Sequence, residues 1–127
     1  MSTLKTGTVQ NNTGTGAPLF KNNSGTEIGQ LTKAWVNFNG ENTVAISDDF
    51  NVSSITDNGT GNYTVNFTNG MGNGNYAAVV STYISASNSY AAYERIESLS
   101  STSFVIRTIH SSQFRDLSLL CAAVFGD

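Results

Sequence analysis

The run Gly61–Phe67 constrains the fold more than any other stretch of the chain. In it, Tyr63, Val65 and Phe67 alternate with threonine and asparagine. Successive side chains of a β-strand point to opposite faces, so this period of two places the three large residues on one face. The run therefore predicts a β-strand with one face buried against a hydrophobic core.

Two further strands are predicted directly before this run. Val36 and Phe38 share the core face of the sequence AWVNFNG, and Trp35 lies on the second face. Asn39–Gly40 is typical of a hairpin turn, because these residue types tolerate the positive φ angles that such a turn requires. A second turn signal, Asp57–Gly59, separates the polar strand NVSSIT from the alternating run.

The second half of the chain continues the pattern of short strands and turns. Strands are predicted at residues 75–83, 93–97, 103–110 and 117–126. Charged residues make up only 12% of the chain, and Asn, Ser, Thr and Gly dominate its polar part, which favours strands and turns over helices. About seven to eight short strands predict an all-β fold, an antiparallel β-sandwich.

The first third of the chain differs from the rest. Residues 1–33 are rich in glycine, threonine and asparagine, and their spaced apolar residues are Val9, Leu19, Phe20, Ile28 and Leu31. Such a segment buries too little apolar surface to order itself. We expect an extended N-terminal arm at residues 1–33, used for attachment or subunit contact, and a β-sandwich domain at residues 34–127. An unattached tail is the alternative.

Charge and composition exclude several partners. The net charge is −3 and the six basic residues are not clustered, so no nucleic-acid partner is expected. No apolar stretch approaches the length of a membrane span, so no membrane insertion is expected. The lone cysteine, Cys121, allows no internal disulfide and is expected to be a small buried residue. With His110 as the single histidine, no metal site and no cofactor are predicted.

Several segments also match a known class of protein. They are AWVNFNG at residues 34–40, TVAI at 43–46, NVSSITDNGTGNYTVNFT at 51–68 and NYAAVV at 75–80. In these segments the chain resembles the C-terminal β-sandwich domain of bacteriophage tail-fibre and receptor-binding virion proteins. It departs from them in the loop sequences ENT and NGMGNGN, which leaves the identity of a ligand open.

The resemblance implies a location and a function. Such domains form homotrimers at the end of a virion appendage and attach to the host cell surface. We therefore expect a virion protein, assembled in the host cytoplasm, that binds a host surface glycan or protein non-covalently and contacts other virion proteins through residues 1–33. The alternative is a structural decoration or adaptor protein of the virion without receptor binding.

Two segments supply the side chains that a glycan site needs, which are aromatic rings and planar polar groups. They lie on either side of the strand predicted at 103–110, so they could meet at one end of a sandwich. The candidate ligand-binding residues are Tyr83, Asn88, Tyr90, Tyr93, His110, Gln113 and Arg115. The alternative is that the tyrosines pack a loop onto the strands and that Arg115 pairs with Asp116.

The chain carries more apolar residues than one sandwich core requires. The last strand is apolar on both faces, which suggests a subunit interface. The candidate interface residues are Trp35, Val105, Ile109, Leu120 and Val124. A last strand covered on its outer face by the N-terminal arm would produce the same pattern.

No catalytic group is predicted. Glu94 and Glu97 would lie on opposite faces of a strand, which disfavours the shared cleft of a glycosidase. Asp48, Asp49 and Asp57 lack the spacing of a calcium loop and are expected in turns. The chain is therefore not expected to be an enzyme.

Overall fold

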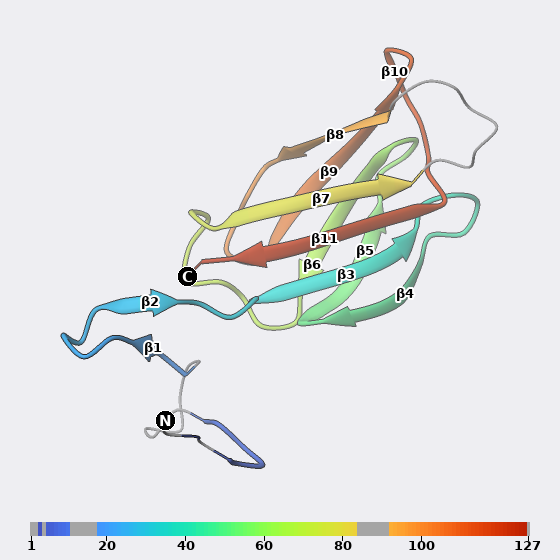
Figure 1. Cartoon of the computed structure of the whole chain (residues 1–127). Helices are drawn as coiled ribbons and strands as arrows, with labels where there is room; N and C mark the ends of the chain where they lie inside the picture. Colours follow the sequence, from blue (N-terminus) through green and yellow to red (C-terminus); the bar gives the residue numbers. More distant parts are fainter. Residues whose placement is uncertain (1–2, 4, 11–17, 84–91, 127) are drawn as a thin grey trace. The chain divides into compact units, whose positions relative to one another are not determined.

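The computed structural model of the chain describes residues 3, 5–10, 18–83 and 92–126 (Figure 1). These residues contain no helix, and all their strand pairs are antiparallel, so the predicted all-β fold is confirmed. No helix in the described part of the chain is long and apolar enough to span a membrane. The chain divides into two compact units, residues 1–31 and residues 32–127.

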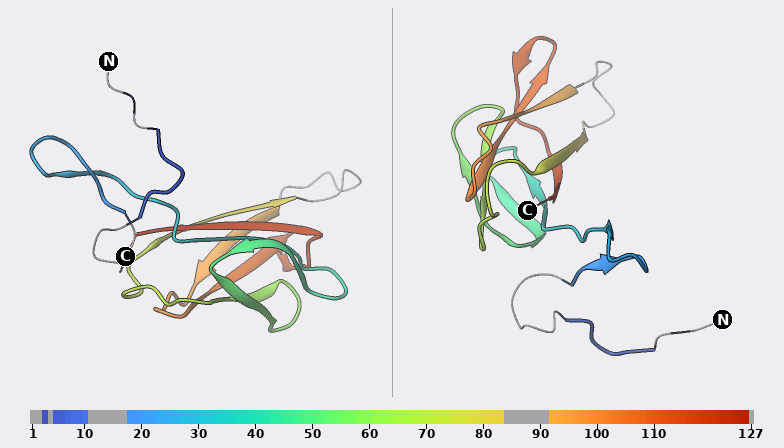
Figure 2. Two further views of the ribbon diagram at one scale, coloured as in Figure 1. Left: turned by 90° about the horizontal axis from the view of Figure 1, so that it is seen from below. Right: turned by 90° about the vertical axis from the view of Figure 1, so that its left-hand side faces the viewer.

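Residues 32–127 fold as a β-sandwich of two sheets (Figure 2). The first sheet has the order β4 (Ala45–Phe50), β3 (Ala34–Asn39), β11 (Leu119–Phe125) and β7 (Ala77–Tyr83). The second sheet contains β5 (Val52–Asp57), β6 (Asn62–Phe67), β9 (Ser103–His110) and β8 (Ala92–Glu97), with the short strand β10 (Gln113–Phe114). The last strand, β11, thus returns to the centre of the first sheet.

Strand β9 organises the second sheet. Its residues 105–107 pair with both β6 and β8, so these two strands lie along opposite edges of β9. Its residues 109–110 pair with both β8 and β10. Strand β10 therefore continues the line of β6 along one edge of β9, and β8 lies along the other edge.

The hydrophobic core lies between the two sheets. The predicted core residues Val36, Phe38, Tyr63, Val65 and Phe67 are all confirmed, with at most 8% of their surface exposed. Phe38 and Tyr63 meet edge to face, with ring centroids 5.4 Å apart. A second aromatic cluster consists of Phe67, Tyr76 and Phe104.

A buried hydroxyl ties the loops at one end of the sandwich to the core. The Tyr63 hydroxyl lies 2.7 Å from Asp116 Oδ1 and 3.0 Å from the carbonyl oxygen of Gly40. The Gly61 amide donates to the same Asp116 oxygen at 2.7 Å. Burial and the Asp116 carboxylate raise the pKa of Tyr63 far above its ordinary value, so the hydroxyl stays protonated and serves as a donor. We call these four residues the tyrosine clamp.

The turns differ from their prediction in two places. Strand β3 ends at Asn39 as predicted, but the positive φ of the following turn belongs to Asn42, at 58°, and not to Asn39 or Gly40. Gly40 is instead packed closely, since a Cβ there would lie 2.6 Å from the Tyr63 hydroxyl. The predicted turn at Asp48 and Asp49 is also wrong, because β4 runs through both residues to Phe50.

Two of the predicted interface residues are core residues. Leu120 is 0% and Val124 1% exposed, because the even-numbered residues of β11 point into the sandwich. The other three lie on outer faces. Trp35 belongs to the first sheet, whereas Val105 and Ile109 belong to the second, so these residues do not form one surface.

The N-terminal unit contains a small hairpin. Strands β1 (Phe20–Lys21) and β2 (Glu27–Gly29) pair, and the Asn22 side chain accepts hydrogen bonds from the Ser24 and Thr26 amides at 3.0 Å each. Both strands are exposed throughout. The exposed large apolar residues of the unit are Val9, Leu19, Phe20, Ile28 and Leu31. An isolated two-stranded hairpin is marginally stable in water, so a contact that covers these exposed apolar side chains would stabilise it.

Candidate binding cleft

An open cleft of about 470 Å³ lies on the outer face of the second sheet, where β8, β9 and β10 run side by side. Tyr93 pairs with Ile109, and Ile109 pairs with Phe114, which places the three side chains in one row across the strands. Ser112 and Gln113 complete the lining at the tip of the β9–β10 hairpin. The cleft therefore combines two aromatic rings, an aliphatic floor, a hydroxyl and an amide.

The hairpin that carries Phe114 has a strained turn. Ser111 and Ser112 both adopt positive φ angles, 51° and 66°, as the two-residue turn between His110 and Gln113 requires. Glycine and asparagine are the residues that accept this conformation readily, and two serines do so at a cost of about 1 kcal/mol or more each. The two strained serines directly precede Gln113 and Phe114, whose side chains line the cleft.

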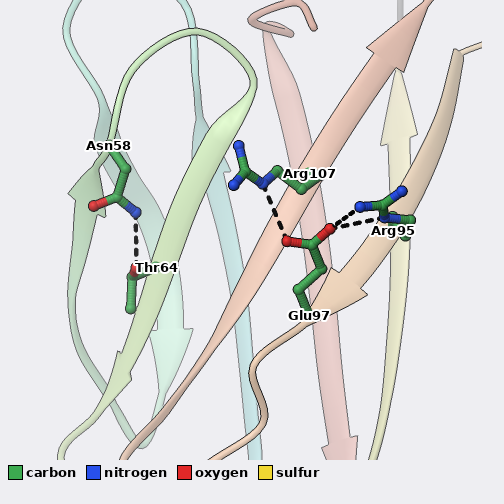
Figure 3. A network of polar contacts seen from close by, with 5 residues as sticks. All are labelled: Asn58, Thr64, Arg95, Glu97 and Arg107. Atoms are coloured by element: carbon green, nitrogen blue, oxygen red, sulfur yellow. Dashed lines mark hydrogen bonds and ion pairs between the residues drawn. The ribbon is translucent and has the colours of Figure 1, made fainter.

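A charged network of Arg95, Glu97 and Arg107 connects β8 and β9 (Figure 3). The Arg107 guanidinium lies 5.2 Å from the centre of the Phe114 ring, a cation–π contact. Arg107 Nε also donates to Glu97 Oε2 at 3.3 Å, and Arg95 Nε donates to Glu97 Oε1 at 2.8 Å. The hydrogen bond from Arg95, supported by Arg107, lowers the pKa of Glu97. Glu97 thus separates two like charges that face each other across β8 and β9.

The exposure of the rings suits a ligand that stacks. Tyr93 is 52% and Phe114 50% exposed, so each keeps about half of its surface available while it is held by its strand. Ring faces stack on the C–H groups of a sugar or on an apolar side chain, and a hydroxyl and an amide can bond to polar groups at the rim. None of the five lining residues is a carboxylate, a histidine or a cysteine.

The structure brings together only part of the predicted ligand site. Tyr93 and Gln113 line the cleft. Arg115 instead borders a second depression of about 310 Å³, beside Asp116 of the clamp. His110 is 7% exposed and points into the sandwich, so its prediction as an accessible ligand residue is wrong.

The remaining predicted ligand residues lie elsewhere. Tyr83 ends β7 in the first sheet, where it is 55% exposed and away from the cleft lining. Asn88 and Tyr90 fall outside the described residues. Among the described residues, the two predicted segments meet through Tyr93 and the β9–β10 hairpin.

Phe114 and Ser112 are the cleft residues that sequence reasoning missed, and Ile109 was assigned to an interface. A signal for them exists, because a two-residue turn at Ser111–Ser112 places Phe114 opposite Ile109. Serine is uncommon in such a turn, so the signal is weak without the structure.

The acidic residues of β8 behave as predicted, on opposite faces of the strand. The Glu94 carboxylate accepts a hydrogen bond from the Thr82 hydroxyl of β7, whereas Glu97 joins the network on the outer face. Within the described residues, no group of three or more His, Cys, Asp or Glu side chains is placed to hold a metal ion.

We compared the chain with models of protein families, with curated proteins and with solved structures, and none of them matches it.

Proposed function

We propose that this protein is a bacteriophage virion appendage protein, of a tail fibre or tip, that attaches to the host cell surface by non-covalent binding. The resemblance of its segments to tail-fibre domains supports the class of protein. The cleft on β8, β9 and β10 supports the binding function, and it is the observation that carries the proposal. The bound group is a surface glycan or a protein segment that stacks on Tyr93 and Phe114.

The arrangement of the cleft supports binding without chemistry. Its two half-exposed rings are held by strands and by Arg107, so a ligand meets a preformed surface and little ordering cost is expected on binding. Its polar groups are neutral, which favours recognition by shape and hydrogen bonding over long-range attraction.

The N-terminal unit supports a role in attachment to the virion. Its exposed apolar residues Leu19, Phe20, Ile28 and Leu31 need a surface to cover them. A neighbouring virion protein would provide that surface, and the sandwich would then remain available for the host. The same unit is the observation that favours the alternative function, a decoration or adaptor protein whose contacts are all within the virion.

Binding to whole cells tests this proposal. Fluorescently labelled protein is incubated with a panel of bacterial strains and, in parallel, with an array of bacterial surface glycans. We expect the wild type to bind at least one strain or glycan, and Phe114→Ala and Tyr93→Ala to reduce that binding at least tenfold. Tyr83→Ala is the matched control, because Tyr83 is equally exposed but lies on the other sheet.

Two outcomes would overturn the proposal. If the wild type binds no strain and no glycan of the panel, the structural alternative is favoured. If Phe114→Ala binds as well as the wild type, the cleft is not the binding site.

A further inference from the structure

The chain contains four Asn–Gly pairs, and in this sequence the asparagine side chain can deamidate without an enzyme. The pairs are Asn39–Gly40, Asn58–Gly59, Asn69–Gly70 and Asn73–Gly74. Glycine has no Cβ to shield its backbone nitrogen, so this nitrogen can reach the side-chain carbonyl carbon of the preceding asparagine. All four pairs share this chemistry, and the hydrogen bonds of the fold determine which of them can use it.

Deamidation requires a free glycine nitrogen beside the asparagine Cγ. The nitrogen loses its proton to hydroxide and forms a bond to Cγ, while the Cγ–Nδ2 bond breaks and Nδ2 leaves as ammonia with a proton taken from water. Water then opens the succinimide ring to aspartate or isoaspartate. A glycine N–H that donates a hydrogen bond would have to give up that bond before it could attack, so the bond protects the asparagine.

The pair Asn39–Gly40 is protected at both reacting groups. The Gly40 amide donates to the carbonyl oxygen of Leu117 at 2.9 Å. Asn39 Nδ2, the leaving group, donates to the carbonyl oxygens of Glu41 at 2.8 Å and Thr43 at 3.2 Å. This pair should therefore react slowly in the folded chain.

The pair Asn58–Gly59 is protected in the same way by side chains. The Gly59 amide donates to Asp57 Oδ1 at 2.9 Å, and Asn58 Nδ2 donates to Thr64 Oγ1 at 2.8 Å. Both reacting groups again have a partner, although the partners are exposed and easier to remove than those of Asn39–Gly40.

The pair Asn69–Gly70 is protected only at its side chain. Asn69 Nδ2 and the Asn69 backbone amide both donate to Asn51 Oδ1, at 3.2 and 2.7 Å. The Gly70 amide donates no hydrogen bond to any described residue. The nucleophile is thus available, but the side chain that it would attack is tied to Asn51.

The pair Asn73–Gly74 differs from the other three. Neither the Gly74 amide nor Asn73 Nδ2 donates a hydrogen bond within the described part of the chain. The Asn75 amide donates to Asn73 Oδ1 at 2.6 Å, and the small ring that this bond closes contains both Asn73 Cγ and the Gly74 nitrogen. The same donor stabilises the negative charge that Oδ1 gains when Cγ is attacked.

The loop around Asn73 is fixed on the sandwich at both ends. The Met71 amide donates to the carbonyl oxygen of Ser101 at 2.7 Å, and the Tyr76 hydroxyl donates to that of Ser103 at 3.0 Å. The exposed Asn73 lies between these two anchors. The reacting atoms are therefore held near each other while the side chain stays open to the water that hydrolysis consumes.

From these contacts we propose that Asn73 is a deamidation site, converted to aspartate or isoaspartate faster than the other three Asn–Gly asparagines. The product carries one more negative charge than the chain's −3, and isoaspartate adds a carbon to the main chain. The neighbouring Gly74 lies against Leu99, before β9, whereas the cleft lies at the other end of that strand. The modification does not depend on the proposed attachment function.

Peptide mapping by mass spectrometry tests the proposal on the full chain. Wild type is incubated in mildly alkaline buffer, digested with pepsin at acid pH, where the reaction is slow, and sequenced by electron-transfer fragmentation, which distinguishes isoaspartate from aspartate. We expect Asn73 to deamidate at least tenfold faster than Asn39. Asn39 is the matched control, because its Oδ1 also accepts a hydrogen bond from the amide two residues on, that of Glu41.

Two further measurements separate the fold from the local sequence. In guanidinium chloride the four rates should converge to within about threefold, since the hydrogen bonds that distinguish the pairs are lost. Asp57→Ala removes the acceptor of the Gly59 amide, and we expect it to raise the rate at Asn58 at least threefold in the folded chain and leave Asn73 unchanged.

Three results would overturn the proposal. One is that any of the other three asparagines reacts as fast as Asn73 in the folded chain. Another is that the order of rates persists in guanidinium chloride, which would assign it to flanking residues. The third is that Asn73 stays intact in the folded chain over a period in which the unfolded chain deamidates.

Discussion

The outer faces of the two sheets differ although they belong to one sandwich. The second sheet carries polar side chains, the Arg95–Glu97–Arg107 network and an open cleft. The outer face of the first sheet carries the exposed apolar residues Trp35, Phe50, Val79 and Phe125, and its strands carry no charge outside β4. Both faces are built on strands whose inner residues form the same core. The difference shows that the alternation of inner residues determines the fold, whereas the outer residues can differ between the two sheets without changing it.

The largest expected loss of stability comes from a substitution at Gly61, in the turn between β5 and β6. Gly61 has a positive φ of 62°, and a Cβ there would lie 2.6 Å from the Thr108 carbonyl oxygen and 2.7 Å from the Arg115 amide nitrogen. Backbone atoms cannot move aside as a flexible side chain can, so we expect Gly61→Ala to lower the free energy of unfolding by about 3 kcal/mol. Urea denaturation measures this, together with loss of ligand binding.

Gly59→Ala is the control for this prediction. Gly59 also has a positive φ, 106°, but nothing lies within 4 Å of the position of its Cβ. We expect it to cost only about 1 kcal/mol, from backbone strain alone. Equal effects of the two substitutions would show that crowding at Gly61 is unimportant.

The tyrosine clamp links the loops at Gly40, Gly61 and Asp116 to the core. Removing its hydroxyl should have the next largest effect on the free energy of unfolding. Tyr63→Phe deletes the hydroxyl that donates to Asp116 and leaves that carboxylate with one donor fewer. We expect a loss of about 1–2 kcal/mol in the free energy of unfolding at neutral pH. Ligand binding should change little, because the ring still fills the core.

The same residue predicts a pH dependence. Burial raises the pKa of Tyr63 in the folded state above its ordinary value near 10, so ionisation favours the unfolded chain. The contribution of Tyr63 is fully present below pH 10 and is lost as the pH rises further. Wild type should lose stability above pH 10 more steeply than Tyr63→Phe, and parallel curves would contradict a buried, hydrogen-bonded hydroxyl.

A change confined to the cleft hairpin should have a smaller effect and the opposite sign. Asparagine at position 111 and glycine at position 112 accept the positive φ angles that two serines now adopt. We expect the double variant Ser111→Asn/Ser112→Gly to raise the free energy of unfolding by about 1 kcal/mol, measured by thermal denaturation. No stabilisation would mean that the turn is not strained.

The smallest effect is expected at the surface network of the second sheet. Arg95 and Arg107 lower the pKa of Glu97, so the stability that Glu97 adds is present at neutral pH and is lost as the pH falls below about 4.5, its ordinary value. Glu97→Gln should therefore differ slightly from wild type at pH 7 in low salt, and the difference should shrink as the pH falls below 4.5 or as salt is added. A large difference at pH 3 would assign Glu97 another role.

The strands were predictable from the sequence because each inner face has a clear period of two. The period of two predicts that Tyr63, Val65 and Phe67 share one buried face. It also predicts that Trp35 lies on an outer face. The assignment of Leu120 and Val124 to an interface failed for a physical reason. Strand β11 is central and apolar on both sides, so its sequence does not show which side faces the core.

The cleft was harder to predict than the fold. It depends on the pairing register of three consecutive strands, β8, β9 and β10, and on a turn with two serines at positive φ, which the local sequence disfavours. His110 was expected to contribute to a ligand site at the end of the strand predicted at 103–110, but the alternation of β9 carries its side chain inward. Tyr93 and Gln113 were found because aromatic and amide residues near strand ends are the usual components of a binding surface.

The most direct test of the account measures cell and glycan binding on parallel preparations of wild type, Phe114→Ala and Tyr83→Ala. The account predicts that Phe114→Ala keeps the circular-dichroism spectrum of the wild type and loses binding at least tenfold, whereas Tyr83→Ala, on the other sheet, binds as the wild type does. Binding by Phe114→Ala equal to that of the wild type, or an equal loss in both variants, would contradict a binding site on the second sheet.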